Sequence, residues 1–353
     1  MQSKPSISVV IPAYNREAFI AESVESVLRQ TVPPDEIVVV DDGSADDTLK
    51  IAKRFEDRGV VCIEKGHNGA AATRNVACAA CRGDYILVMD SDDVIFEDSV
   101  ERLVAVYDRE PGLDVYYGDL VATDELLKPI KRIKYPQWRG REDRLFSAHA
   151  FTNQIGNPFC LMRREWLRIR GGYAEDFDRC EDWELWCRST ESMSVCHVEA
   201  DLGYWRWHTK NMSANRAQHV RVSDDRTIRT RVRLAVSREE HVSRLGWESA
   251  VAASANREAL IWGAGEYGEA VDEMLRRMGV DAGGFVDSDP RMAGQTYRGR
   301  KVRSPDELRQ NEHRPYIFVA SVYEHEISME LERMDFAEIR DFARPHGVEY
   351  HRL

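Results

Sequence analysis

Short apolar segments alternate with amphipathic stretches through the first hundred residues of the chain. The first segment, residues 6–11, reads SISVVI, and residues 17–30 then repeat apolar side chains at helical spacing. Further apolar segments follow at 36–40, 60–63 and 85–89. Strands that are apolar throughout, separated by amphipathic helices, predict a mostly parallel sheet with helices on both faces. The predicted fold class is therefore α/β.

Two local signals refine the predicted element ends. Pro12 directly follows the first apolar segment and is expected to end that strand. Ser44 and Asp47 have the spacing of a capping box, which predicts a helix that continues to Phe55.

Polar side chains follow three of the predicted strands at the point where each ends. Tyr14–Asn15, Asp41–Asp42 and Asp90–Asp93 all lie just past an apolar segment. Ligands bind beyond the carboxyl ends of the strands in open parallel sheets. We therefore expect these side chains to converge on one crevice.

The acidic cluster at the third of these strand ends has the pattern of a metal site. Asp90 and Asp92 are two residues apart on an extended segment, so their side chains can face one ligand. Two carboxylates suit Mg²⁺ or Mn²⁺, which bind through one or two carboxylates together with substrate phosphates. The alternative is a turn whose acids cap the helix that follows Asp98.

Three further side chains predict a nucleotide at the same edge. Asp42 can accept an N–H from a base, Tyr14 offers a ring beside it, and Arg74 is a cation suited to a diphosphate. The sequence has no GxxxxGK[ST] segment, which argues against an ATPase or GTPase of the P-loop design.

Charge and composition argue against other classes of protein. The formal net charge of −12 disfavours a nucleic-acid partner, because such proteins are usually basic over the binding domain. The seven cysteines, including Cys78 and Cys81 in an alanine-rich helical pattern, are expected to be reduced thiols. No apolar run approaches a membrane span and no secretory segment precedes the first strand, so we expect a soluble, cytoplasmic protein.

Residues 128–144 form a basic segment with proline and glycine, which predicts a loop. The segment has two interpretations: a solvated loop, or a site for an anionic partner. That partner is either a lipid-linked diphosphate acceptor or the inner face of an anionic membrane, which the protein would contact peripherally. A homo-oligomer also stays open.

A second α/β pattern begins near residue 255. Residues 259–262 are predicted as a strand, and the glycine turn GAGEYG follows with a helix behind it. Gly263, Gly265 and Gly268, with Asp287 19 residues further on, fit the dinucleotide-binding fingerprint in this context. The segment is too short to add the catalytic half of a dehydrogenase, so we expect a binding or assembly module.

Five motifs occur in a fixed order between residues 6 and 213: SVVIPAYNR, VDDGSADDT, NGAAATRN, YILVMDSDD and EDWELWCR. In this order and at these separations they resemble the family 2 inverting glycosyltransferases, which have a GT-A-type fold. The C-terminal pattern similarly resembles the small Rossmann-like nucleotide-binding domains appended to sugar-modifying enzymes. The predicted domains are a GT-A-type glycosyltransferase domain over 1–215, a helical connector over 216–254 and a Rossmann-like domain over 255–353.

The resemblance also implies roles for the residues at matching positions. Asp182 of the EDW motif matches the general base, and Asp92 and Asp90 match the pair that binds Mn²⁺ or Mg²⁺. The implied donor-binding residues are Pro12, Tyr14, Asn15, Asp42, Arg74, Asp90, Ser91 and His208. A neighbouring acid, Glu181, and an apolar wall are expected to raise the pKa of Asp182.

The activity that this resemblance implies is transfer of a sugar, with inversion, from a nucleotide-diphosphate donor to a hydroxyl of a glycan or glycolipid in surface polysaccharide biosynthesis. Asp42 favours a base with an imide-type N–H, which leans toward UDP or dTDP. Two alternatives stay open. One is an NAD(P)- or sugar-nucleotide-dependent oxidoreductase or epimerase that uses the C-terminal domain, and the other is a non-catalytic scaffold that binds sugar nucleotides.

Overall fold

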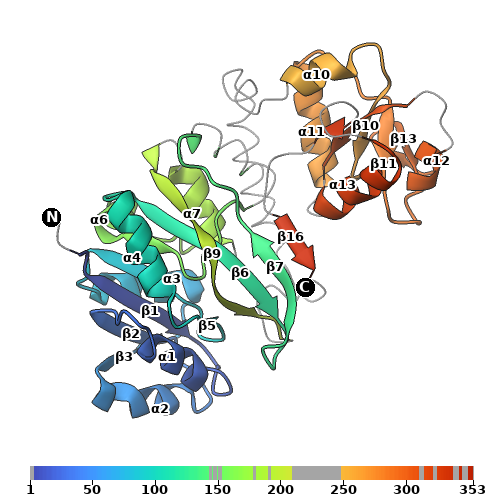
Figure 1. Ribbon diagram of the computed structural model, residues 1–353. Helices are drawn as coiled ribbons and strands as arrows, with labels where there is room; N and C mark the ends of the chain where they lie inside the picture. Colours follow the sequence, from blue (N-terminus) through green and yellow to red (C-terminus); the bar gives the residue numbers. More distant parts are fainter. Residues whose placement is uncertain are drawn as a thin grey trace. The chain divides into compact units, whose positions relative to one another are not determined.

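The computed structural model describes residues 4–142, 145, 149, 153–177, 180–189, 192–208, 248–309, 314–320, 324–336, 342–343 and 349–352. These residues form two compact units (Figure 1). The first holds the described residues of 4–142, 153–208 and 349–352, and the second holds residues 145 and 149 and the described residues of 248–343.

The first unit is built on a ten-stranded sheet whose main path runs β16-β7-β6-β8-β4-β1-β2-β3, with β9 beside β6 and β5 beside β9. Strands β1 to β4 are mutually parallel, as the alternating pattern predicted, whereas β7, β8, β5 and β16 add antiparallel pairs. The strands are β1 Ile7–Ala13, β2 Glu36–Asp41, β3 Val60–Glu64, β4 Tyr85–Val88, β5 Val94–Ile95, β6 Val115–Thr123, β7 Pro129–Lys134, β8 Leu161–Arg163, β9 Val195–Arg206 and β16 Glu349–Arg352.

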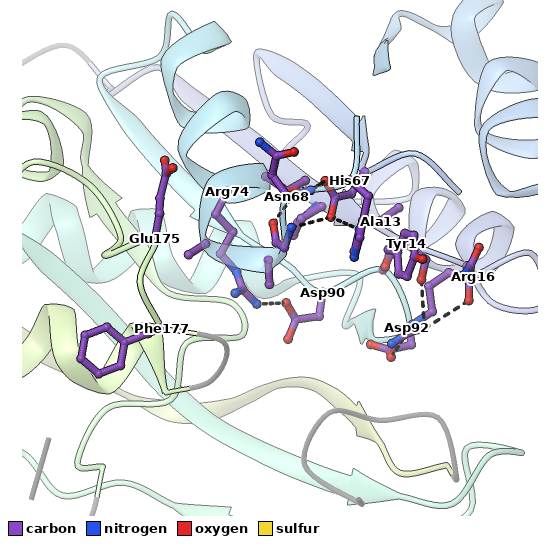
Figure 2. Close-up of a pocket in the computed structure, with 18 of the residues that line it drawn as sticks. Ala13, Tyr14, Arg16, His67, Asn68, Arg74, Asp90, Asp92, Glu175 and Phe177 are labelled. Carbon is purple, nitrogen blue, oxygen red and sulfur yellow. Dashed lines mark hydrogen bonds and ion pairs between the residues drawn. The ribbon is translucent and has the colours of Figure 1, made fainter. Parts of the chain in front are cut away.

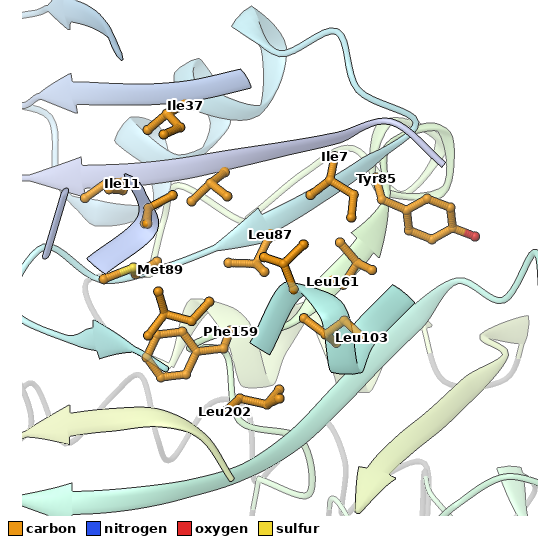
Figure 3. Packing of buried hydrophobic residues seen from close by; sticks show 14 of the residues in the cluster. Ile7, Ile11, Ile37, Tyr85, Leu87, Met89, Leu103, Phe159, Leu161 and Leu202 are labelled. Atoms are coloured by element: carbon orange, nitrogen blue, oxygen red, sulfur yellow. The ribbon is translucent and has the colours of Figure 1, made fainter. Parts of the chain in front are cut away.

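Helices cover this sheet and bury its apolar strands. The helices are α1 Ile20–Leu28, α2 Thr48–Ala52, the 3₁₀ helix η1 Lys53–Arg58, α3 Ala70–Ala80, α4 Ser99–Arg109, α6 Arg164–Ile169 and α7 Glu181–Ser189. Every residue of β1 is buried, because its apolar side chains face packed layers on both sides of the sheet. One core cluster joins Ile7 and Ile11 to Leu87, Phe159 and Leu202 from later strands and loops (Figure 3). This core fixes the strand ends that carry the polar residues.

Pro12 does not end the first strand, which continues to Ala13. The carbonyl of Val10 points toward β4 and accepts a hydrogen bond from Met89 N. Residues two apart in a strand point to the same side, so the nitrogen of Pro12 also faces β4. The pairing of β1 with β4 stops at Val10, so the missing N–H of Pro12 breaks no ladder bond.

The predicted capping box is also wrong. Asp47 makes no side-chain cap, and the hydroxyl of Ser44 accepts a hydrogen bond from Asn15 N instead. Asp46 Oδ1 accepts from the N–H of Thr48, the first residue of α2. Further along the chain, residues 129–134 of the predicted basic loop form strand β7, which pairs with β6 on one side and β16 on the other.

The second unit is a six-stranded sheet in the order β12-β13-β11-β10-β14-β15, parallel except for the β12–β13 pair. Its strands are β10 Ala259–Trp262, β11 Gly284–Val286, β12 Thr296–Tyr297, β13 Arg300–Arg303, β14 Tyr316–Val319 and β15 Phe342–Ala343, and its helices are α10 Glu248–Ser254, α11 Glu266–Arg277, α12 Pro305–Arg309 and α13 Glu324–Arg333. Leu260, Val286 and Ile317 lie in its buried core. This unit is an α/β layer structure in its own right.

Most of the predicted connector, residues 216–247, lies outside the described residues. Among the helices that the structure does describe, none has the length and apolar character needed to cross a bilayer.

Candidate functional site

A pocket of about 500 Å³ opens at the carboxyl edge of the parallel strands in the first unit (Figure 2). The loops after β1, β3 and β4 and the start of α3 supply most of its lining, and the loop after β2 adds Asp42. The predicted site residues that line it are Pro12, Tyr14, Asn15, Asp42, Arg74, Asp90, Ser91 and Asp92. The crevice expected from the strand ends is therefore present. His208 and Asp182 are not among the lining residues. His208 lies within hydrogen-bond distance of Asp92, and the charge of Arg74 acts on Asp182.

Asp42 is a buried residue of the pocket, and both of its carboxylate oxygens accept hydrogen bonds. Its Oδ1 accepts from the Lys65 ammonium and from Asn68 N at 3.0 Å. Its Oδ2 accepts from His67 Nδ1 at 2.8 Å and from Gly69 N at 3.0 Å. Burial alone would raise the pKa of Asp42, but the hydrogen bonds from Lys65, Asn68 and Gly69 outweigh it and lower the pKa. The carboxylate is held ionised, with two donors on each oxygen.

Tyr14 presents its ring at the mouth of the pocket and is partly exposed. The ring of His67 stacks on it, with centroids 4.1 Å apart and planes inclined by 19°. His67 therefore contacts both residues that the sequence assigned to the base. The sequence analysis missed His67, although it stands directly before the Asn68-Gly69 pair that opens α3.

Asn15 shapes the loop after β1. It adopts a left-handed backbone conformation with φ of 53°, which asparagine tolerates better than most residues. Its Oδ1 accepts from Ala45 N, and its own N–H donates to the Ser44 hydroxyl. The residue thus ties the loop after β1 to the loop after β2.

The acidic cluster after β4 is held by contacts with Arg16, His208 and the backbone of Arg206. Asp92 Oδ2 accepts from Arg16 Nε at 3.0 Å and lies 3.0 Å from His208 Nε2. Burial would raise the pKa of Asp92, but the hydrogen bond from His208 and the charge of Arg16 outweigh it and lower the pKa. Asp93 is fully buried, and its Oδ1 accepts from Arg206 N at 2.9 Å. This bond ties the acidic cluster to the end of β9.

Asp90 and Asp92 both line the pocket, as expected for side chains two residues apart at a strand end. Their hard oxygen donors fit Mg²⁺ or Mn²⁺, whose remaining ligands can come from a diphosphate and water. Within the described residues, no group of three or more His, Cys, Asp or Glu side chains has metal-binding geometry.

Arg74 lies on α3 and is almost fully buried at the back of the pocket. Its Nη2 donates to Asp90 Oδ1 at 2.6 Å, and its Nη1 donates to Glu181 Oε1 at the start of α7. The guanidinium also lies 5.7 Å from the ring centroid of Tyr173. Burial alone would lower the pKa of Arg74, but the charges of Asp90 and Glu181 raise it well above its usual value. A single cation therefore links the acidic strand end to the helix that carries Asp182.

Asp182 is the second residue of α7, and its Oδ2 accepts from Asn153 Nδ2 at 2.8 Å. Burial, followed by the negative charge of Glu181, raises its pKa to about 6. Such a carboxyl is ionised at neutral pH yet takes up a proton more readily than an exposed aspartate. The pocket lining also includes Glu175 and Phe177, which the sequence analysis did not single out, and Trp205, one of the tryptophans that the sequence offers for stacking on a sugar ring.

The glycine turn of the second unit connects β10 to α11. Gly263 has φ of 127°, and a Cβ on Gly268 would lie 1.9 Å from Gly263 O, so packing alone requires both glycines. By contrast, a Cβ on Gly265 would meet no atom within 4 Å. Asp287 Oδ2 accepts from Ala264 N at 2.8 Å, so this carboxylate closes the turn.

Comparison with known proteins gives matches for both units. Residues 8–169 match the family model "Glycosyl transferase family 2", and residues 255–340 match the model "C2185-like, N-terminal". The chain is 42% identical over 216 residues to the Escherichia coli UDP-Glc:alpha-D-GlcNAc-diphosphoundecaprenol beta-1,3-glucosyltransferase WfaP, covering 61% of this chain and 82% of that protein.

Two further matches have lower sequence identity. Glycosyltransferase GlyG of Streptococcus pneumoniae is 37% identical over 122 residues, and the match covers 34% of this chain but only 40% of GlyG. The crystal structure of S. aureus TarS 1–349 in complex with UDP-GlcNAc superposes with a TM-score of 0.53 at 21% identity. That superposition covers 68% of this chain and 69% of the TarS chain, and it supports the GT-A-type α/β fold.

Proposed function

Since the chain belongs to glycosyltransferase family 2, we propose that it transfers a sugar from a nucleoside diphosphate donor to a hydroxyl of a glycan or lipid-linked acceptor, with inversion at the anomeric carbon. The observation that carries the proposal is the convergence of three kinds of group on one pocket. These are a base acceptor at Asp42, a cation at Arg74 and the carboxylates of Asp90 and Asp92.

For the donor we propose a UDP-sugar, with a dTDP-sugar as the second choice. An ionised, buried Asp42 is suited to accept the imide N–H that uracil and thymine share, once one of its present donors gives way. The name of WfaP includes UDP-Glc and a diphosphoundecaprenol-linked acceptor, which supports a UDP-sugar and a lipid-linked acceptor here.

The leaving group is the diphosphate, which gains negative charge as the bond between the anomeric carbon and its oxygen breaks. Asp90 and Asp92 would hold Mn²⁺ or Mg²⁺ at this position, and such a cation supplies electrostatic stabilisation to the diphosphate. Arg74 keeps Asp90 in place and adds positive charge to the same wall of the pocket.

Asp182 is our candidate for the general base. The acceptor hydroxyl gives its proton to the carboxylate while its oxygen forms the new bond to the anomeric carbon, and the nucleoside diphosphate departs from the opposite face. A positioned base of this kind contributes roughly 10²–10⁴-fold to the rate. An α-linked donor sugar would yield a β product.

For the second unit we propose a nucleotide- or sugar-nucleotide-binding module of Rossmann-like type. The open space in front of Gly265 supports it, because close approach of a phosphate is the property that a glycine without a packing role provides.

The deciding experiment is calorimetric binding of UDP, dTDP, GDP and NAD⁺ to the full chain, each with and without Mn²⁺. The variants are Asp92→Ala and a control, Asp98→Ala, whose carboxylate pairs with Arg102 outside the pocket. We expect Mn²⁺-dependent binding of one pyrimidine diphosphate in the wild type and in Asp98→Ala, and its loss in Asp92→Ala. Binding of NAD⁺ alone, without any Mn²⁺-dependent diphosphate, would move the chemistry to the second unit and refute the proposal.

A further inference from the structure

The hairpin of β6 and β7 carries an apolar tip that the pocket does not use. Leu126 in the connecting loop is 88% exposed, and Ile130 at the start of β7 is 43% exposed. Trp207, 41% exposed, lies beside them because its N–H donates to Thr123 O at the end of β6. Single exposed apolar residues are ordinary on a protein surface, but three at one projecting sheet end indicate a contact surface.

Two lysines lie at this tip. Lys128 is exposed, and Lys131 Nζ lies 4.9 Å from the centroid of the Trp207 ring. Local positive charge of this kind stands out on a chain whose net charge is −12. Arg132 does not add to it, since it is paired with Asp201 at 2.6 Å.

The loop also contains two acids, and one of them is engaged in the turn. Asp124 Oδ1 accepts from Leu126 N at 3.0 Å and from Lys128 N at 2.8 Å. These bonds hold the backbone that presents Leu126. Glu125 is exposed and is the acid at the tip that opposes the lysines.

We propose that Leu126, Ile130 and Trp207, with the lysines around them, dock the protein onto an anionic lipid bilayer. Tryptophan favours the membrane–water interface, aliphatic side chains enter it, and lysines are attracted to anionic headgroups. A stable protein partner would instead need a broad face of roughly 800 Å² on each side. A narrow hairpin tip of three apolar side chains suits a lipid surface better.

The docking surface adjoins the pocket. Trp205 lines the pocket, and its ring centroid lies 5.3 Å from that of Trp207 in an edge-to-face arrangement. A protein docked by this hairpin would bring the mouth of the pocket close to the headgroups. Docking itself does not depend on the transfer reaction; only its use in collecting a lipid-linked acceptor rests on the proposed function.

The test is co-sedimentation of the full chain with vesicles of phosphatidylcholine alone and with vesicles that also contain phosphatidylglycerol. The variants are Leu126→Ser/Ile130→Ser and Lys128→Glu/Lys131→Glu. The matched control is Ile169→Ser on α6, since Ile169 is 64% exposed and is also flanked by arginines, Arg168 and Arg170.

We expect the wild type to bind the anionic vesicles, and salt to weaken that binding. Both double variants should lose roughly tenfold or more in vesicle affinity, because binding scales with buried apolar area and with charge. Ile169→Ser should bind as the wild type does. UDP binding with Mn²⁺ should survive in all the variants, which separates a failure of docking from a failure of the proposed function.

Three outcomes would overturn the proposal. The first is a wild type that does not bind anionic vesicles, and the second is a control variant that loses as much vesicle affinity as the hairpin variants. The third is a wild type that is dimeric by light scattering and becomes monomeric in Leu126→Ser/Ile130→Ser, which would assign the surface to a second copy of the chain.

Discussion

Arg74 forms a salt bridge with Glu181, the residue directly before Asp182. The two residues are 107 positions apart in sequence, and both side chains are about 95% buried. Because Arg74 also donates to Asp90, the pair fixes the distance between the proposed metal carboxylates and the proposed base. A single guanidinium therefore positions both proposed parts of the site, the metal carboxylates and the general base.

Arg74→Lys should strongly reduce sugar transfer. A lysine keeps the charge but not the planar fork, so it cannot satisfy both Asp90 and Glu181. Loss of one buried charge-assisted hydrogen bond costs about 1.5–3 kcal/mol, or roughly 10- to 150-fold in rate if the transition state needs it. Initial rates of transfer with a UDP-sugar and Mn²⁺ provide the measurement.

The control for this variant is Arg188→Lys on the same helix. Arg188 donates to Glu184 at 2.8 Å and lies outside the pocket, so its rate should stay close to that of the wild type. Equal losses in the two variants would mean that Arg74 matters only for the packing of α7.

Activity should fall as the pH drops through about 6. The folded-state pKa of Asp182 is raised to about 6, mainly by burial and then by the charge of Glu181. A general base works only when deprotonated, so kcat/KM should be level above this pKa and decline below it. Asp182→Asn should lose roughly 10²-fold or more and show no such decline.

Glu181→Gln tests the cause of that pKa. Removing the neighbouring negative charge lowers the pKa of Asp182, so the acid limb of the kcat/KM profile should move to lower pH. Glu184→Gln, on the same helix, should leave the limb in place. A limb that moves equally in both variants, or in neither, contradicts the assignment to Asp182.

The sequence predicted the layout of the site better than its contacts. Tyr14, Asp42 and Asp90 converge because buried parallel strands set their ends at one edge, and that arrangement follows from the apolar pattern alone. Which side chains then pair is decided by tertiary packing. No local pattern links Arg74 to Glu181.

Three features of the fold escaped prediction for similar reasons. Strand β9 runs for twelve residues and ends where a tryptophan-rich stretch begins, and its irregular register with β6 has no simple periodicity to detect. Strand β16 pairs with β7 across more than two hundred positions of sequence. Pro12 lies inside β1 because its nitrogen faces β4, and β4 no longer pairs with β1 beyond Val10. Only the order of strands in the sheet reveals this.

His67→Ala should increase the affinity for UDP several-fold in the presence of Mn²⁺. His67 covers one face of Tyr14 and occupies one acceptor position of Asp42, so a base has to displace it from both. Removing the ring removes that competition and raises the fraction of the protein that is ready to bind. Calorimetric titration measures the change, with Asp98→Ala again as the control. A substantial loss of affinity would show instead that His67 itself contacts the nucleotide.

Gly268→Ala should destabilise the second unit, whereas Gly265→Ala should not. A methyl group on Gly268 would lie 1.9 Å from Gly263 O, which forces α11 away from β10 and costs about 1–3 kcal/mol or more. The same methyl on Gly265 points into open space. Calorimetric unfolding of the full chain should therefore show a lower transition temperature for Gly268→Ala only. Equal shifts of the transition temperature in both variants would mean that the turn at 263–268 is packed differently. If Gly265→Ala binds a nucleotide as the wild type does, that result would argue against phosphate approach at this glycine.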